Sequence, residues 1–169
     1  MQATTPPAAQ PGKRINPALI APFVNSVRSV FQTMVKVETT VTRPYLKDDS
    51  TPSYDVSSII GFTGDVTGSV VISLQMAAAK ALTSSFAGMP IEANTPEFTD
   101  AIGELANMIA GGAKKHLGAA AGITVPTVVI GAGHQIVRLS DVPCVVIPCQ
   151  TPVGNFAVEV NIKQLTPAA

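Results

Sequence analysis

The sequence predicts an α+β fold in which a layer of helices covers a mostly antiparallel sheet. A hairpin pattern joins two β-rich runs, Val56–Thr63 and Val66–Leu74, through the two-residue turn Gly64-Asp65. Two helical patterns follow the hairpin, and further β-branched runs follow the helices. Groups of strands that are separated by a pair of helices are typical of α+β domains, because parallel sheets need strands and helices in strict alternation.

Before the hairpin, the first expected element is a helix. Asn16-Pro17 resembles an N-cap and first-turn pair, and apolar residues at helical spacing extend this helix to about Met34. The β-branched stretch Val35–Thr42 is predicted to be a strand, and the polar stretch Pro44–Ser53 is predicted to be a loop.

After the hairpin we expect two helices and then strands. The first helix is an alanine-rich segment, Met76–Phe86, which Gly88 ends. The second covers residues 96–116, with Thr95 as its N-cap and Pro96 in its first turn. The strands expected after it are Thr124–Gly131, Pro143–Cys149 and Phe156–Lys163, with His134–Val137 as a further candidate.

Composition favours one folded domain and argues against a nucleic-acid partner. The 169 residues are 46% hydrophobic and 13% charged, which suits a sizeable core. Eleven basic and eleven acidic residues cancel, and only 5% of the residues are aromatic, so neither a basic surface nor a base-stacking platform is indicated. Residues 1–14 are rich in proline and are predicted to be a flexible tail before a single domain at 15–165.

The chain shows no targeting or membrane signal. No apolar run reaches the ~18 residues of a membrane span, and the N-terminus lacks the apolar segment of a signal peptide. Cys144 and Cys149 are five residues apart in one predicted strand, so their side chains lie on opposite faces and cannot easily bridge each other. These features predict two buried free thiols in a cytoplasmic protein.

The helix at 96–116 carries two opposite stripes. Its apolar stripe consists of Phe98, Ile102, Leu105, Ile109 and Ala113. Its polar stripe consists of Asp100, Glu104, Asn107, Gly111 and Lys114. Glu104 and Asn107 are three residues apart, so a carboxylate and a carboxamide project side by side. Gly111 and Gly112 each cost about 1 kcal/mol relative to alanine. The pattern alone fits a solvated helix face. Close approach of another molecule to the helix backbone is one reason why glycines that destabilise the helix would be present here.

Other candidate chemistry is weak. Gly131-Ala-Gly133-His134 lacks the strand–loop–helix setting of a dinucleotide or phosphate site, so a turn is the expected structure. His116 falls on the apolar stripe, where it would complement the helix dipole, and His134 has no neighbours at metal-ligand spacing. No nucleophile signature is present. Because the dinucleotide, phosphate and metal-ligand patterns are missing as well, we expect no metal and no cofactor of the protein's own.

Three blocks of the sequence together resemble a known family. In order along the chain, Ile59–Val71, Ala101–Gly111 and Pro126–Gly131 resemble the CheX branch of the CheC/CheX/FliY chemotaxis phosphatases, and the resemblance spans about residues 16–163. The family's signature is an acidic residue and an asparagine on one helix, which here are Glu104 and Asn107. CheC-like members carry two such helices, whereas this chain has one pair at that spacing.

The resemblance implies hydrolysis of the aspartyl phosphate on a CheY-like response regulator. The regulator would supply the phosphoaspartate, its Mg²⁺ and a lysine. Glu104 would pair with that lysine, Asn107 would hold the attacking water, and Asp100, Gly111 and Lys114 would contact the partner. A non-catalytic module that binds a receiver domain or a flagellar-switch protein through the same face remains the alternative.

The resemblance also implies a homodimer, because CheX-type relatives associate through their sheets. The low charge fraction and β-branched strands such as Phe156–Lys163 are compatible with this, since an unpaired apolar edge is usually covered.

Overall fold

The structure is a computed structural model and describes residues 14–138 and 141–165, so most of the predicted N-terminal tail lies outside the described residues. The helices are α1 (Pro17–Val30), a π-helix (Phe31–Val35), α2 (Met76–Ala87) and α3 (Pro96–Lys114). The strands are β1 (Thr40–Val41), β2 (Tyr45–Lys47), β3 (Val56–Thr63), β4 (Val66–Leu74), β5 (Gly122–Ile123), β6 (Thr127–Ile130), β7 (Cys144–Thr151) and β8 (Gly154–Gln164).

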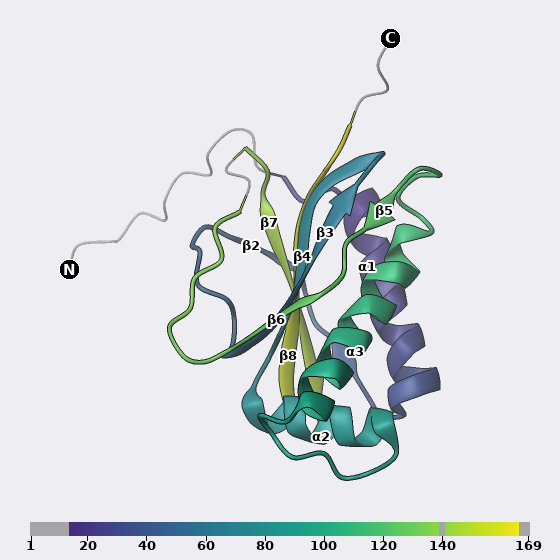
Figure 1. Ribbon diagram of the computed structural model, residues 1–169. Coiled ribbons are helices and arrows are strands. Elements are labelled where there is room, and N and C mark those ends of the chain that lie inside the picture. The colour runs from purple at the N-terminus through teal and green to yellow at the C-terminus, as the bar shows by residue number, and fades with distance from the viewer. Residues whose placement is uncertain (1–13, 139–140, 166–169) are drawn as a thin grey trace, which may run out of the picture.

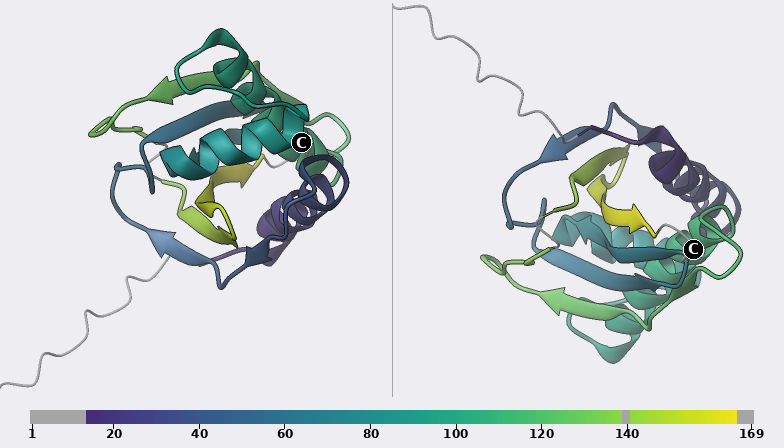
Figure 2. Two further views of the ribbon diagram at one scale, coloured as in Figure 1. Left: turned by 90° about the horizontal axis from the view of Figure 1, so that it is seen from below. Right: turned by 90° about the horizontal axis from the view of Figure 1, so that it is seen from above.

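All eight described strands form one antiparallel sheet, with α1 and α3 side by side against one face and α2 near one end (Figure 1). The strand order is β1-β7-β8-β4-β3-β5, and β2 and β6 add to β7 and β3 respectively. Figure 2, which looks along the strands, shows α1 and α3 on the same side of the sheet. The predicted α+β fold, with a layer of helices on a mostly antiparallel sheet, is confirmed. The boundaries predicted for a single domain, 15–165, stay a prediction.

The hairpin and the helix caps follow the local sequence. Strands β3 and β4 have the predicted bounds, and Gly64 between them has a φ of +83°, which glycine adopts without strain. At α1, Asn16 Oδ1 accepts a hydrogen bond from the Ala18 amide at 3.1 Å. At α3, Thr95 Oγ1 accepts one from the Phe98 amide at 3.2 Å. These caps satisfy amides that would otherwise lack a partner inside the helix.

Two predictions for the segment after α1 are wrong. The predicted strand Val35–Thr42 forms only at β1, although the Thr42 amide also donates to the Pro148 carbonyl at 2.9 Å, and Val35 still belongs to the π-helix. Lys36, with a left-handed φ of 58°, ends that helix, and its amide donates to the Phe31 carbonyl at 2.7 Å. The stretch predicted as a loop contains β2, which pairs with β7. Pairing with a strand a hundred residues away overrides local propensity here.

Three strand predictions near the C-terminus also need correction. Residues 134–137 form no strand, although the Ile136 amide donates to the Ser50 carbonyl at 2.8 Å. The strand predicted at Thr124–Gly131 is shorter, because within it only β6 pairs with β3. Strand β8 lies between β4 and β7, so it is not the unpaired edge that the homodimer prediction used.

The core lies between the helices and the sheet. Alternate residues of β3, β4, β7 and β8 face this core, and aromatic rings meet there in two pairs. Phe31 stacks on Phe156 with centroids 4.8 Å apart, and Phe23 meets Phe62 edge-on at 5.8 Å. Such pairs contribute roughly 0.5–1.5 kcal/mol beyond the burial of their area. The fully packed layer gives α3 a rigid support.

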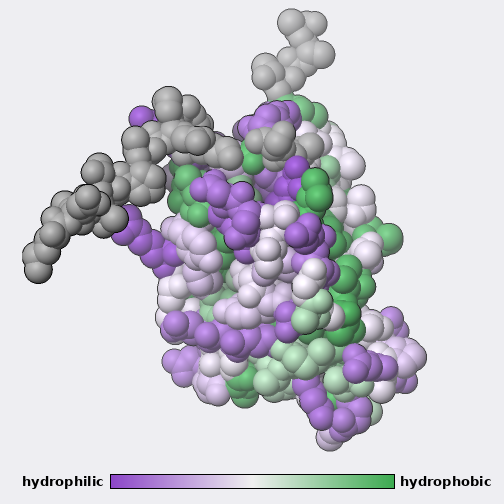
Figure 3. Space-filling view, turned by 90° about the vertical axis from the view of Figure 1, so that its left-hand side faces the viewer, coloured by the Kyte–Doolittle hydropathy of each residue, from purple (hydrophilic) through white to green (hydrophobic). Residues whose placement is uncertain are grey.

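The opposite face of the sheet is covered by connecting segments instead of helices. Residues 48–55 and 131–138 run across it, and the Tyr54 amide donates to Ser73 Oγ of β4 at 2.8 Å. Figure 3 views the molecule from the side on which β2 lies in Figure 1, and groups of hydrophilic side chains lie on this surface around a paler middle of intermediate hydropathy. Polar contacts therefore hold these segments on the sheet.

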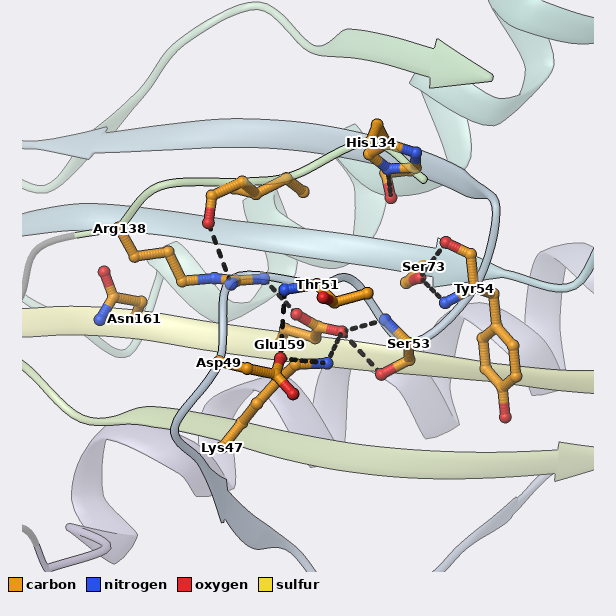
Figure 4. Close-up of polar contacts among 12 residues, drawn as sticks. Lys47, Asp49, Thr51, Ser53, Tyr54, Ser73, His134, Arg138, Glu159 and Asn161 are labelled. Carbon is orange, nitrogen blue, oxygen red and sulfur yellow. Dashed lines mark hydrogen bonds and ion pairs between the residues drawn. The ribbon is translucent and has the colours of Figure 1, made fainter. Parts of the chain in front are cut away.

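A buried ion cluster lies beneath these segments (Figure 4). The Glu159 side chain on β8 has no solvent exposure, and its Oε1 accepts from the Ser53 amide at 2.7 Å and the Ser53 hydroxyl at 2.6 Å. Lys47 Nζ lies 3.3 Å from the same oxygen, and Arg138 forms an ion pair with the other carboxylate oxygen. We call these four residues the Glu159 cluster.

Both thiols of the described residues are free and buried, as predicted. Cys149 packs in the core, whereas Cys144, on the opposite face of β7, lines a cavity together with Lys47 and Arg138. Burial raises the pKa of Cys144 to about 11 and that of Cys149 to about 12. Among the described residues, none of the helices combines the length and apolarity that a membrane crossing requires.

Candidate functional site

Helix α3 presents the two stripes that its sequence predicts. The apolar residues Phe98, Ile102, Leu105 and Ile109 are buried against the sheet. On the outer surface, Glu104 is exposed and Asn107 is half-buried. No hydrogen bond or ion pair joins either side chain to another residue that the structure describes. A carboxylate and a carboxamide are therefore free to bind a partner, one turn apart on a rigid helix.

Packing on both sides holds α3 in place. On one side, Ser26 of α1 donates its hydroxyl to the Ile109 carbonyl at 2.7 Å. On the other side, Gly103 lies so close to Pro126 that a Cβ at this glycine would be 3.2 Å from the proline ring. The helix is thus fixed between α1 and the segment that leads into β6. A fixed support is what a positioning site requires, because small displacements at such a site cost much activity.

The rest of the polar stripe extends along the same ridge. Asp100 is exposed, and Gly111 and Lys114 are half-buried. The helix ends at Lys114, two residues earlier than predicted. His116 is consequently exposed, and its predicted place on the buried stripe is wrong, because the helical periodicity stops before it.

Gly112 is required for the packing of α1 against α3. A Cβ at this position would lie 2.2 Å from Ser26 Oγ, so only glycine allows α1 to approach α3 this closely. Close approach by another molecule is therefore not needed to explain Gly112. This contact depends on how the two helices cross, which the sequence pattern does not show.

A second polar pair, missed by sequence reasoning, lies on the other face of the sheet. His134 Nε2 is 2.9 Å from the hydroxyl of Ser57, and Nδ1 is 2.7 Å from the Gly131 carbonyl. Ser57 is fully buried in β3, so this pair ties the 131–138 segment to the sheet and offers no exposed nucleophile.

The chemistry available on α3 is positioning. Within the described part of the chain, no group of three or more His, Cys, Asp or Glu side chains is placed to hold a metal ion. The exposed ridge supplies an acceptor, Glu104, and an amide, Asn107, which both donates and accepts hydrogen bonds. These groups can orient water and bind a cation, whereas an attacking nucleophile must come from water or from the partner.

Comparison with known families and structures identifies the relatives of this site. The family model for the chemotaxis phosphatase CheX matches residues 56–150, which include all of α3. The chain belongs to the CheX family. The resemblance of its three sequence blocks to CheX is thereby confirmed. A comparison with curated proteins gives no match.

Several solved structures share the CheX fold with this chain. A CheC-like superfamily protein from Shewanella sp. PV-4 is 32% identical, with a TM-score of 0.79, over 88% of this chain and 99% of its own. CheX from Desulfovibrio desulfuricans is 30% identical, with a TM-score of 0.77, over 87% of this chain and 99% of its own. CheX from Borrelia burgdorferi, solved in complex with CheY, BeF₃ and Mg²⁺, is 25% identical, with a TM-score of 0.71, over 89% of this chain and 100% of its own.

Proposed function

We propose that this protein is a phosphatase that hydrolyses the aspartyl phosphate of a CheY-like response regulator. The observation that carries the proposal is the free Glu104–Asn107 pair on the exposed ridge of α3, in a chain of the CheX family. The Borrelia burgdorferi structure, in which CheX is bound to CheY with BeF₃ and Mg²⁺, supports a response regulator as the partner. We also propose that this protein acts in the cytoplasm, together with that regulator.

In this proposal Asn107 aligns the attacking water with phosphorus. Its carboxamide is not a base, but phosphoryl transfer through a loose transition state depends on alignment and charge stabilisation more than on proton abstraction. The regulator supplies the phosphoaspartate, Mg²⁺ and a lysine. An acceleration of about a hundredfold requires only ~2.7 kcal/mol, which is within reach of one positioned amide.

Glu104 in this proposal docks the helix by pairing with the regulator's lysine. Its exposed carboxylate is one turn before Asn107, so the pairing would bring the amide to the phosphoryl group. Asp100 and Lys114, at the two ends of the ridge, would contact the regulator outside its active site.

A phosphate-release assay tests the function. The regulator is phosphorylated with a small-molecule phosphodonor, the donor is removed, and phosphate release is followed with and without the protein. We expect the protein to accelerate release catalytically. If it binds the BeF₃-activated regulator but never accelerates release, it is a binding module for receiver domains instead.

Glu104→Gln should weaken binding more than it slows turnover. The substitution removes the charge that pairs with a lysine at a desolvated interface, and loss of such a partner costs about 2–5 kcal/mol. Calorimetric titration with the BeF₃-activated regulator measures the affinity, and turnover is measured at saturating protein. An unchanged dissociation constant would contradict the docking role.

We also propose a homodimer. Because β8 is central, the candidate edges are β1 and β2 along β7, and β5 and β6 along β3. Val125, in the segment between β5 and β6, is 84% exposed, and an exposed apolar residue at a sheet edge is usually covered. Light scattering at tens of micromolar should give twice the chain mass of 17.4 kDa. A species at the chain mass alone would contradict the dimer.

A further inference from the structure

Gly111 occupies a position where glycine is unfavourable. It lies in the last turns of α3, four residues after Asn107 and on the same exposed ridge. Glycine in a helix interior is less stable than alanine, because its backbone loses more freedom on folding. An unfavourable residue at a site facing solvent calls for a reason.

The fold itself gives no reason for this glycine. An ideal Cβ at Gly111 would have Ile123 Cδ1 as its nearest neighbour, at 4.0 Å, which is ordinary van der Waals contact. The other two glycines of α3 differ, since a Cβ would be 3.2 Å from the Pro126 ring at Gly103 and 2.2 Å from Ser26 Oγ at Gly112. Of the three, Gly111 alone could become alanine without displacing an atom of the described chain.

The surroundings of Gly111 leave room for another chain. It lines a groove of about 680 Å³ between α1 and α3, together with Met108 and Lys114 of α3. Side chains four residues apart on a helix lie about 5–6 Å from one another, so this bare backbone is adjacent to Asn107. A partner segment that crosses α3 at Gly111 would therefore lie next to the water and the phosphoryl group that Asn107 is proposed to align.

We propose that Gly111 is the point at which the response regulator's main chain, beside its phosphoaspartate, crosses α3 in van der Waals contact. The inference rests on the proposed function and adds a positioning residue to it. The missing side chain lets the regulator approach until its phosphoryl group reaches the water held by Asn107. A methyl group here would hold the two proteins apart, and a displacement of about 1 Å at such a site costs roughly a hundredfold in rate.

Gly111→Ala tests this, with Gly112→Ala as the matched control. For Gly111→Ala we expect the melting temperature to rise by about 1–4 °C at fixed protein concentration. Its affinity for the BeF₃-activated regulator, with Mg²⁺ present, should fall about tenfold or more. Its kcat/KM for phosphate release should fall about 10- to 100-fold. For Gly112→Ala we expect a lower melting temperature, because Ser26 is in the way.

Two results would overturn the inference. If Gly111→Ala melts higher but binds and turns over like the wild type, no partner backbone approaches this residue. If it melts lower, as Gly112→Ala should, the glycine serves internal packing. If the proposed function itself is wrong, the result differs, because the wild-type protein would then not accelerate phosphate release. The binding comparison with the activated regulator would still decide the inference in that case.

Discussion

Asn107→Ala should abolish the stimulated loss of phosphate while leaving the affinity for the phosphorylated regulator nearly unchanged. The amide acts on water in the transition state and contributes little to binding of the ground state. We expect a loss of about a hundredfold or more, which corresponds to ~2.7 kcal/mol or more of transition-state stabilisation. Single-turnover phosphate release measures the rate, and titration with the BeF₃-activated regulator measures the affinity.

Stability and a companion variant serve as controls for Asn107→Ala. The Asn107 side chain makes no hydrogen bond to another described residue, so its removal should leave the free energy of unfolding nearly unchanged. Glu104→Gln should show the opposite division, with the larger effect in affinity. Full activity of Asn107→Ala against a cognate regulator would show that the water-positioning role is wrong.

Glu159→Gln should lower the free energy of unfolding by about 3–5 kcal/mol. The substitution keeps the shape of the side chain but removes its charge, while Lys47 and Arg138, whose side chains are 10% and 6% exposed, remain beside it. Both cations then lose their buried carboxylate, and Lys47 keeps the 70% exposed Asp49, at 3.8 Å. This loss is costly, because neither buried cation regains full hydration. Urea unfolding at fixed protein concentration measures the loss.

Glu92→Gln is the matched control for this prediction. Glu92 pairs with Lys80 at 2.8 Å, but the two side chains are 75% and 47% exposed. Exposed ion pairs contribute about 0–1 kcal/mol, so this variant should be nearly as stable as the wild type. If both variants lost a similarly small amount of unfolding free energy, the Glu159 cluster would not be desolvated as proposed. Folded Glu159→Gln should retain phosphatase activity, because Glu159 lies on the face of the sheet opposite α3.

Local sequence determined the elements whose signals are complete within a few residues. The β3–β4 hairpin has its predicted bounds because its strands and two-residue turn are adjacent in sequence. The N-caps Asn16 and Thr95 begin α1 and α3 for the same reason. The stripe with Glu104 and Asn107 was also predictable, since helical periodicity alone separates buried from exposed positions.

Contacts between distant segments decided the rest. Strand β2 exists because β7 offers a partner, and β8 is central because β4 and β7 pair on both of its sides. In sequence, Glu159 is one of several polar residues that alternate with apolar residues in β8. Only the fold brings Lys47 and Arg138 to its carboxylate, from positions 112 and 21 residues away. Gly111 and Gly112 are adjacent glycines of one helix, and only the crossing of α1 and α3 shows that Gly112 is needed for internal packing and Gly111 is not. Sequence periodicity predicts which side chains of a helix or strand share a face. Which segment packs against that face depends on the tertiary structure.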